Sequence, residues 1–285
     1  MKKVLVTGAA GVLGKALVPL LEQDADIELR LTDIRPVDTP HEFRQADLST
    51  WDDVSRLCEG IEEVVHIAAI HPWKPYFAQQ YLDCNIKGTY NILQAAVDAG
   101  VRRVVYTSSI AAMGYRPDRP GQVVFDESKA CRPAEDVYGI SKHVGEQFCE
   151  MFHRRSGLSY IALRPGTFVP RDGRDASFGL GLLTQWLHAG DVAAAHRLAL
   201  RSTVENEAII ITAKVPFVPA DAPALMADAP GVIARYFPDA ARLAERGVEL
   251  PSTIDRCYSI AKAERLLGFR PRLNFGEWLE GFLAS

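Results

Sequence analysis

The chain has 285 residues, of which 48% are hydrophobic, and its formal net charge is −4 at pH 7. This length fits one large domain or a main domain with a smaller lobe, and the charge gives no reason to expect nucleic acid or an anionic membrane as a partner. No run of eighteen apolar residues occurs, and Met-Lys-Lys leads directly into the first apolar run, so we expect a cytoplasmic protein. The five scattered cysteines and the histidines show no ligand spacing, so we predict free thiols and no metal site.

The first fourteen residues predict a strand, a glycine turn and a helix. An apolar run over 4–6 precedes Gly8, Gly11 and Gly14, and a helical apolar pattern follows over 12–23. Gly8 would allow a tight turn, Gly11 would let backbone N–H groups approach a pyrophosphate, and Gly14 would let helix and strand pack closely. The alternative is a plain glycine-rich turn, because the spacing is Gly-x-x-Gly-x-x-Gly rather than Gly-x-Gly-x-x-Gly. The pattern indicates a dinucleotide cradle with phosphate at the helix N-terminus.

Asp33 follows a predicted strand over 27–32 and lies nineteen residues after Gly14. At this place in a dinucleotide fold, an acidic residue accepts hydrogen bonds from the adenosine ribose. A carboxylate there repels a 2′-phosphate, which favours NAD over NADP, although the neighbouring Arg35 would weaken that exclusion. The alternative is an ordinary loop aspartate.

Strand and helix patterns then alternate as far as residue 212. We expect helices over 51–58, 81–99, 137–156 and 187–200, and strands over 63–68, 101–108, 159–163 and 208–212. This alternation predicts an α/β, doubly wound parallel-sheet Rossmann fold. The proline-rich stretch 216–251 differs in character and contains a predicted helix over 232–246. We therefore predict a dinucleotide-binding domain of residues 1–165 plus about 186–212, and a small substrate-binding lobe of residues 166–185 and 213–285.

The pair Tyr138 and Lys142 is the main catalytic signal. A spacing of four residues places both side chains on one face of the predicted helix. Tyrosine has a pKa near ~10, and a neighbouring ammonium lowers that value by stabilising the phenolate. A hydroxyl from Tyr106-Thr107-Ser108-Ser109, at the end of the preceding strand, would be the third partner, because ligands bind at strand carboxyl ends. Chance occurrence of Tyr-x-x-x-Lys is the alternative for this motif alone.

Taken together, these motifs resemble the extended short-chain dehydrogenases/reductases, also called the NAD-dependent epimerase/dehydratase family. The resemblance covers nearly the whole chain. Its marks are the glycine motif over 6–14, Asp33, Ala-Asp-Leu at 46–48, Val-Val-His-Ile-Ala-Ala at 64–69, Asn-Ile-Lys-Gly-Thr at 85–89, Tyr-Thr-Ser-Ser at 106–109, Tyr138 with Lys142, Leu-Arg-Pro-Gly at 163–166, and Lys-Ala-Glu-Arg-Leu-Leu-Gly-Phe-Arg-Pro at 262–271.

The resemblance implies roles for individual residues. Tyr138 would be the general acid/base tuned by Lys142, and Ser109, or alternatively Ser108, would hydrogen-bond the substrate. Asn85 would support the site through water, whereas His66 would be a core residue beside the cofactor. A homodimer is implied through the helices over 81–99 and 137–156, although helix amphipathicity cannot distinguish that contact from an internal core. The implied NAD-binding residues are Gly8, Ala10, Gly11, Val12, Leu13, Gly14, Asp33, Asp47, Leu48, Ala68, Ala69, Asn85, Thr107, Tyr138, Lys142 and Pro165.

Members of this family are dehydrogenases, epimerases or dehydratases. Residues 110–113 contain no acid after Ser109, which disfavours dehydration. Only 27 residues separate Arg164 from Asp191, so little chain is present to enclose a nucleotide sugar, and this short form is similar to uronate dehydrogenases. The stretch 213–251 is longer than in that subgroup and would restore part of a larger pocket.

We therefore predict an NAD-dependent dehydrogenase that moves hydride between NAD and a carbinol of a small sugar-like or uronic-acid-like substrate. Arg171 or Arg174 would clamp a substrate carboxylate, with a solvated loop charge as the alternative for each. One alternative function is a nucleotide-sugar 4-epimerase with tightly bound NAD. Another is a non-catalytic dinucleotide-sensing regulator, a class that usually lacks the tyrosine–lysine pair.

Overall fold

The core of the molecule is a seven-stranded sheet in which every neighbouring pair of strands is parallel. The computed structural model describes residues 1–72, 75–168 and 175–285. The strand order β3-β2-β1-β4-β5-β7-β8 reverses direction at β1, and the central strands are buried apolar runs, as expected for a sheet covered on both faces. The predicted doubly wound fold is confirmed. The strands are β1 Lys2–Thr7, β2 Ile27–Asp33, β3 Glu42–Gln45, β4 Glu63–His66, β5 Arg103–Thr107, β7 Ser159–Pro165 and β8 Glu207–Ile211.

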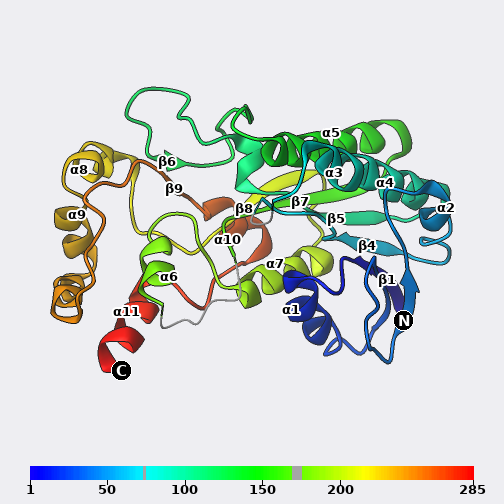
Figure 1. Cartoon of the computed structure of the whole chain (residues 1–285), viewed down its shortest axis with the longest axis horizontal. Helices are drawn as coiled ribbons and strands as arrows, with labels where there is room; N and C mark the ends of the chain where they lie inside the picture. The colour runs from blue at the N-terminus through cyan, green and yellow to red at the C-terminus, as the bar shows by residue number, and fades with distance from the viewer. Residues whose placement is uncertain (73–74, 169–174) are drawn as a thin grey trace.

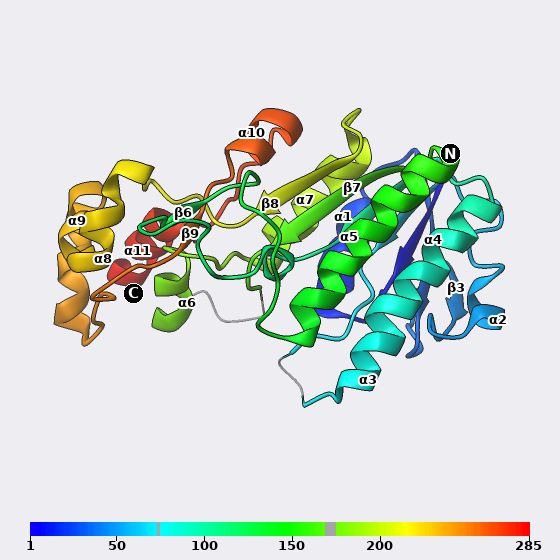
Figure 2. The same ribbon diagram turned by 90° about the horizontal axis from the view of Figure 1, so that it is seen from above.

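Helices cover both faces of this sheet (Figures 1 and 2). One face packs against α1 (Val12–Leu21), α7 (Ala189–Arg201) and α10 (Ala261–Leu267), and its core includes residues of all three helices. The other face packs against α4 (Gly88–Asp98) and α5 (Val137–Ser156). Each helix therefore buries an apolar stripe against the sheet. Because the strands are parallel, their carboxyl ends all lie at one edge of the sheet.

Two predicted helices differ from the structure. The helix expected over 81–99 is three segments: α3 (Ala78–Tyr81), a π-helix η1 (Leu82–Lys87) and α4. The helix expected over 51–58 ends early, as α2 (Trp51–Val54), and turns follow it. Arg30 donates hydrogen bonds of 2.8 Å to the carbonyls of Leu57 and Glu59 in these turns.

The C-terminal part of the chain builds a second lobe beside the sheet (Figure 1). Its own apolar core includes Phe178, Phe275 and Trp278. The helix predicted over 232–246 is wrong as one element, because α9 stops at Tyr236 and a 3-10 segment begins at Pro238, a residue without a backbone N–H. The lobe contains α6 Ala176–Gly181, η3 Pro219–Asp221, α8 Ala222–Ala227, α9 Ala229–Tyr236, η4 Pro238–Arg246 and α11 Phe275–Ala284.

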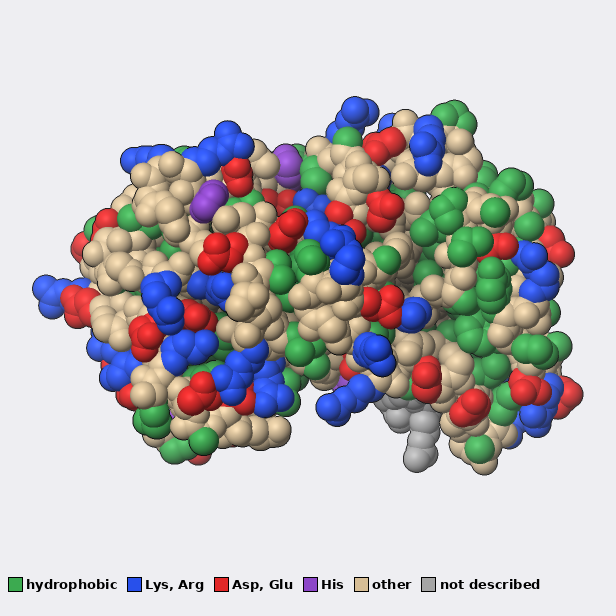
Figure 3. Space-filling view, turned by 180° about the vertical axis from the view of Figure 1, so that it is seen from behind, with side chains coloured by type: hydrophobic (Ala, Val, Ile, Leu, Met, Phe, Trp, Pro, Cys, Tyr) green, Lys and Arg blue, Asp and Glu red, His purple; other side chains and the backbone are tan. Residues whose placement is uncertain are grey.

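A small two-stranded sheet joins distant parts of the chain. β6 (Val124–Phe125) pairs in parallel with β9 (Cys257–Tyr258). A short 3-10 segment, η2 (Ile110–Met113), follows β5. Figure 3 shows hydrophobic side chains gathered on the face of the second lobe, at the right of the view. Across the described residues, each helix is too short or too polar to traverse a lipid bilayer.

Candidate active site

The turn between β1 and α1 has the geometry of a phosphate cradle. Gly8 has a φ of +73°, and a Cβ on it would lie 2.8 Å from the backbone N and Cα of Ala68. A Cβ on Gly14 would clash with the backbone of Ala9, so helix and strand meet closely there. Both predicted glycine roles are confirmed. Gly11 is the N-cap of α1 and has no side chain to cap the first-turn N–H groups, which fits a pyrophosphate at this helix end.

Asp33 ends β2 and is buried beside this turn, with 9% of its surface exposed. Its Oδ2 accepts a hydrogen bond of 2.9 Å from the N–H of Ala10, and its Oδ1 accepts one of 2.9 Å from the N–H of Arg35. The Arg35 guanidinium donates at 2.9 Å to the carbonyl of Ala10. The turn, the acid and the cation are thus locked together at the place where the sequence predicts the adenosine ribose.

The predicted catalytic residues gather at the carboxyl end of β5. Asp136 caps α5 by accepting a hydrogen bond of 2.6 Å from the N–H of Gly139, which starts the helix that carries Tyr138 and Lys142. The Lys142 Nζ donates at 2.8 Å to the carbonyl of Thr107 and lies 5.9 Å from the centroid of the Tyr138 ring. Ser109 follows β5 and interacts with Tyr138 through its hydroxyl.

Burial sets the protonation of this pair. Removal from water raises the pKa of Tyr138 well above 10, and the hydrogen bond from Ser109 opposes that rise. Burial also lowers the pKa of Lys142 from 10.5 to about 8. The predicted lowering of the Tyr138 pKa by Lys142 is therefore wrong for the chain alone: the phenol is buried, and the ammonium is directed at the Thr107 carbonyl.

Asn85 connects three parts of the site. It lies in the π-helix η1, an element that often marks functional positions. Its Oδ1 accepts from the N–H of Ile70 at 2.9 Å, and its Nδ2 donates to the Ile70 carbonyl and to the Ser141 hydroxyl, both at 3.1 Å. Ser141 in turn donates at 2.7 Å to the Tyr138 carbonyl. Asn85 thus ties the segment after β4 to the helix that carries the catalytic pair.

A buried ion pair lies beside Lys142 and was not predicted. Arg164 makes two hydrogen bonds of 2.8 Å to Glu146, and the Ser108 hydroxyl donates to the same carboxylate at 2.6 Å. Glu146 is four residues after Lys142 on α5, a spacing that is visible in the sequence, whereas its partner on β7 is not. The Ser108 hydroxyl therefore donates its one hydrogen bond to Glu146.

Cys131 and His143 lie close to this pair. Their ligand atoms and an oxygen of Glu146 are within 4.8 Å of one another, a spacing compatible with a metal ion. However, the guanidinium of Arg164 donates to the Cys131 sulfur at 3.2 Å and already neutralises Glu146. A cation would meet this fixed positive charge, so the chemistry of the cluster does not fit a metal centre.

Two buried histidines, His66 and His196, are hydrogen-bonded at both ring nitrogens within the fold. One ring nitrogen of His66 is hydrogen-bonded to the hydroxyl of Thr7 at 2.8 Å and the other to the hydroxyl of Thr89 at 3.1 Å. These contacts confirm its predicted packing role. His196 on α7 is hydrogen-bonded to the hydroxyl of Thr107 at 2.8 Å. Burial, with the nearby charge of Lys142, lowers the pKa of His66 to about 3 and that of His196 to about 4.

Aromatic side chains surround Tyr138. The exposed His71 has its ring centroid 4.9 Å from that of Tyr138, and the Tyr81 ring lies 6.5 Å away. Tyr115 packs in the same cluster, and the Arg256 guanidinium lies 4.8 Å from the Tyr115 ring centroid. His71 and Tyr115 lie in irregular segments with no periodic pattern, so no local pattern predicts their place in the site.

The remaining predicted residues that the structure describes lie at the same edge of the sheet. Arg171 and Arg174 are outside the described residues. Leu48 is buried against Gly88 in α4, and its carbonyl accepts from Asn91 at 2.9 Å. Several predicted NAD-binding residues either end a strand or come shortly after one. They are Ala10, Val12, Leu13, Asp47, Leu48, Ala68, Ala69, Thr107 and Pro165.

Comparison with known proteins agrees with this geometry. The model of the NAD dependent epimerase/dehydratase family matches residues 4–180. The uronate dehydrogenase of Pseudomonas syringae pv. tomato is 34% identical over 172 residues, which are 59% of this chain and 60% of that one. The uronate dehydrogenase of Agrobacterium fabrum is 33% identical over 209 residues, 72% of this chain and 74% of that one. The match to the first of these relatives thus spans less than two thirds of its length.

Solved structures show the same fold. The uronate dehydrogenase of Agrobacterium tumefaciens has a TM-score of 0.71 and 24% identity, and the comparison covers 100% of this chain and 90% of that one. The predicted similarity to uronate dehydrogenases is confirmed by these relatives, and NAD as the cofactor is confirmed at the level of the family. The chain belongs to the NAD-dependent epimerase/dehydratase family.

Proposed function

We propose that this protein is an NAD-dependent dehydrogenase that oxidises a carbinol of a small sugar-like substrate, most specifically a uronic acid. The observation that carries this proposal is the placement of Tyr138, Lys142 and Ser109 together at the carboxyl end of β5, in a chain 31–34% identical to three uronate dehydrogenases. The L-arabinose 1-dehydrogenase (NAD(P)(+)) of Haloferax volcanii, 28% identical over 74% of this chain, supports the wider class of sugar oxidation.

The cofactor would lie along the carboxyl edge of the sheet. The first turn of α1 would receive the pyrophosphate, and Asp33 would accept hydrogen bonds from the adenosine ribose. NAD⁺ supplies a hydride acceptor at nicotinamide C4 and a positive charge that favours the phenolate form of Tyr138. Lys142, held by the Thr107 carbonyl, would orient the nicotinamide ribose.

The residues of the chain would move the proton and hold the substrate. The phenolate Oη of Tyr138 would take the proton of the substrate hydroxyl while the carbinol carbon gives a hydride to NAD⁺, so that one O–H and one C–H bond break, a carbonyl forms and NAD⁺ is reduced to NADH. Ser109 would hold the reacting oxygen, whereas Ser108 stabilises Glu146 in the structure. Asn85 would hold α5, and with it Tyr138, in position through its hydrogen bond to Ser141.

The substrate would enter between the sheet and the second lobe. We propose that residues 1–165 with about 186–212 bind the dinucleotide and that residues 166–185 with 213–285 bind the substrate. The separate apolar core around Phe178, Phe275 and Trp278 supports this division. A carboxylate ligand from Arg171 or Arg174 stays a prediction.

A homodimer through α4 and α5 also stays a prediction. Leu82 on η1, Tyr90 on α4 and Ile140 on α5 have 43%, 36% and 42% of their surfaces exposed and would be covered by a second copy. Light scattering of the purified chain would test the assembly independently of the activity.

The test of the function is formation of NADH, followed at 340 nm, with NAD and a panel of uronic acids, neutral aldoses and UDP-, GDP- and dTDP-sugars. We expect steady NADH accumulation with a free uronate or aldose. The Tyr138→Phe variant should lose about 10²- to 10⁴-fold in kcat while still binding NAD, because it lacks only the proton acceptor.

Two outcomes would contradict the proposal. Stereoisomer formation from a nucleotide sugar without net NADH would identify a 4-epimerase instead. Binding of NAD without turnover of any member of the panel, together with the same NAD affinity in Tyr138→Phe as in the wild type, would favour a dinucleotide-sensing regulator.

A further inference from the structure

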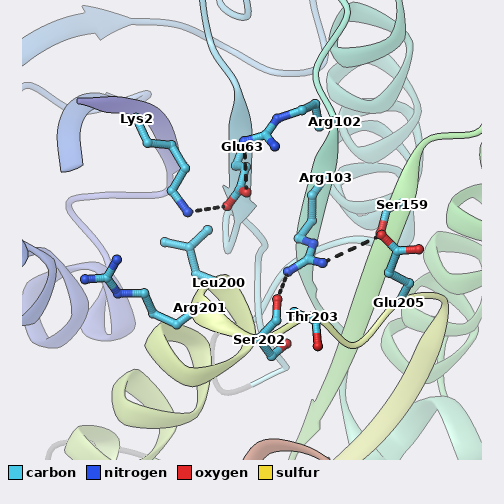
Figure 4. A pocket seen from close by; sticks show the side chains of 10 residues that line it. All are labelled: Lys2, Glu63, Arg102, Arg103, Ser159, Leu200, Arg201, Ser202, Thr203 and Glu205. Atoms are coloured by element: carbon cyan, nitrogen blue, oxygen red, sulfur yellow. Dashed lines mark hydrogen bonds and ion pairs between the residues drawn. The ribbon is translucent and has the colours of Figure 1, made fainter. Parts of the chain in front are cut away.

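A cavity lies at the amino-terminal edge of the sheet, opposite the edge that holds Tyr138. Its volume is about 510 Å³, within the range of small-molecule sites. The starts of β1, β4, β5 and β7 form one side of it, and the end of α7 with the following loop forms the other (Figure 4). The catalytic residues and the predicted NAD-binding residues lie outside its lining.

Strand register places three of its side chains in one row. Glu63 on β4 is paired with Arg103 on β5, and Arg103 is paired with Ser159 on β7. Paired residues of parallel strands point to the same face of a sheet, so these three side chains are presented together. Lys2 reaches the row from β1 by a 3.0 Å ion pair to Glu63.

The lining has an excess of positive charge, although the whole chain has a net charge of −4. Carboxylates outside the lining already pair with part of it: Asp24 and Asp26 contact Arg201, and Glu62 contacts Arg102. Within the lining, Glu63 pairs with Lys2 at 3.0 Å and Glu205 lies 3.8 Å from Arg103, so Arg103 is the basic side chain with the most distant counter-ion. The lining contains four basic side chains, Lys2, Arg102, Arg103 and Arg201, and two acidic ones, Glu63 and Glu205.

Arg103 is buried, with 9% of its surface exposed, and one edge of its guanidinium is firmly held. Its Nη1 donates to the carbonyls of Ser202 and Ala199. Its Nη2 lies 3.8 Å from a carboxylate oxygen of Glu205, beyond hydrogen-bonding distance, and the Glu205 side chain is 58% exposed. The second edge therefore faces a loosely placed counter-ion in the cavity (Figure 4).

Ser159 supplies a second, independent indication. Only 8% of its surface is exposed, and its hydroxyl has no hydrogen-bond partner among the residues that the structure describes. Most buried hydroxyls have a partner, because a buried polar group without a hydrogen bond loses its interaction with water and gains nothing in return. Of the buried polar atoms without a partner in the described residues, the Ser159 hydroxyl is the one that lines this cavity, so it is available to donate to an acceptor-rich ligand.

We propose that this cavity binds the phosphate group of a small anion. The planar guanidinium of Arg103 matches two phosphate oxygens, the Ser159 hydroxyl donates to a third, and Lys2 adds a point charge. Glu205, which competes for the same edge of Arg103, moves away on binding. The phosphate is free or part of a sugar phosphate, and the cavity volume accommodates either.

The experiment is calorimetric titration of the full chain with inorganic phosphate, and separately with glucose 6-phosphate, in the presence of saturating NAD to fill the dinucleotide site. We expect binding to the wild type that is at least about 10-fold weaker in Ser159→Ala, a variant that removes a hydroxyl without breaking a hydrogen bond in the protein. Glu205→Gln should bind phosphate more tightly, because Arg103 loses its competitor.

Glu245→Gln is the matched control. It changes the net charge by the same amount on an exposed helix of the second lobe and should leave the affinity unchanged. Tighter binding of glucose 6-phosphate than of phosphate would identify a phosphate ester as the ligand, and equal affinity would identify free phosphate. Absence of binding at millimolar phosphate, or equal affinities in wild type, Ser159→Ala and Glu205→Gln, would overturn the proposal.

Discussion

Lys142 carries its charge in a buried environment, and this gives the stability of the protein a defined dependence on pH. Its pKa is lowered to about 8 in the folded chain, against an ordinary value of 10.5. Between these two values the unfolded chain binds more protons than the folded one, so the free energy of unfolding rises with pH. Below pH 8 the buried charge is fully destabilising.

The variant Lys142→Met lacks this titration. We expect wild type to gain up to about 3 kcal/mol in the free energy of unfolding, relative to Lys142→Met, between pH 8 and pH 10.5. Urea unfolding of both proteins at pH 7, 8.5 and 10 measures the difference, and effects shared by the two chains cancel. A difference that is constant over this range would show that the folded pKa of Lys142 is not lowered.

We expect Asp33 and Arg35 to set the choice between NAD and NADP. In Asp33→Asn the residue keeps an oxygen to accept the N–H of Ala10 but loses the charge that repels a 2′-phosphate. We expect the ratio of kcat/KM for NAD to that for NADP to fall about 10-fold or more, since Arg35 is then free to attract the phosphate. The measurement is NAD(P)H formation with each cofactor.

Asp52→Asn is the control for this change. Asp52 is exposed in the first turn of α2 and is not one of the predicted NAD-binding residues. Its substitution removes the same charge and should change the cofactor ratio by less than about threefold, because an exposed charge is screened by solvent. An unchanged ratio in Asp33→Asn would mean that the carboxylate does not face the ribose.

At the scale of elements, the position of α5 depends on its close contact with β5. A Cβ at Gly145 would clash with the Tyr106 ring, so only glycine lets the helix approach the strand this closely. We expect Gly145→Ala to lower the free energy of unfolding by about 1–3 kcal/mol through overpacking. Because α5 carries Tyr138 and Lys142, kcat should fall as well.

Gly281→Ala tests the same substitution where space is open. Gly281 lies inside α11, and a Cβ there would meet nothing within 4 Å. Helix propensity predicts a gain of about 0.5–1 kcal/mol. Thermal unfolding of both variants measures the contrast, and destabilisation of equal size in the two would argue against the packing explanation.

Local patterns explain which elements were predictable. The glycine turn, Asp33 and the Tyr138–Lys142 pair depend on short spacings, and each lies where the pattern predicts. β3 was missed because Glu42–Gln45 is polar and partly exposed, with no apolar run to mark it. The π-helix at Asn85 was missed because its sequence has the same apolar periodicity as an α-helix.

At the scale of the whole molecule, long-range pairs were beyond the reach of sequence patterns. The ion pair of Glu146 with Arg164 joins α5 to β7, and the row of Glu63, Arg103 and Ser159 spans three strands. No local spacing relates these residues, because their neighbours are set by strand order. The arrangement of parallel strands was predictable, but the side chains that it brings together were not.

The pairing of β6 with β9 also affects the order in which the protein folds during its synthesis. Val124 pairs with Cys257, 133 residues later in the chain. All seven strands of the main sheet have left the ribosome before β9 is made, whereas β6 waits for its partner throughout. Val123 and Val124 therefore remain without their partner strand in the nascent chain, and this segment stays open to chaperones and to misassembly until translation is nearly complete.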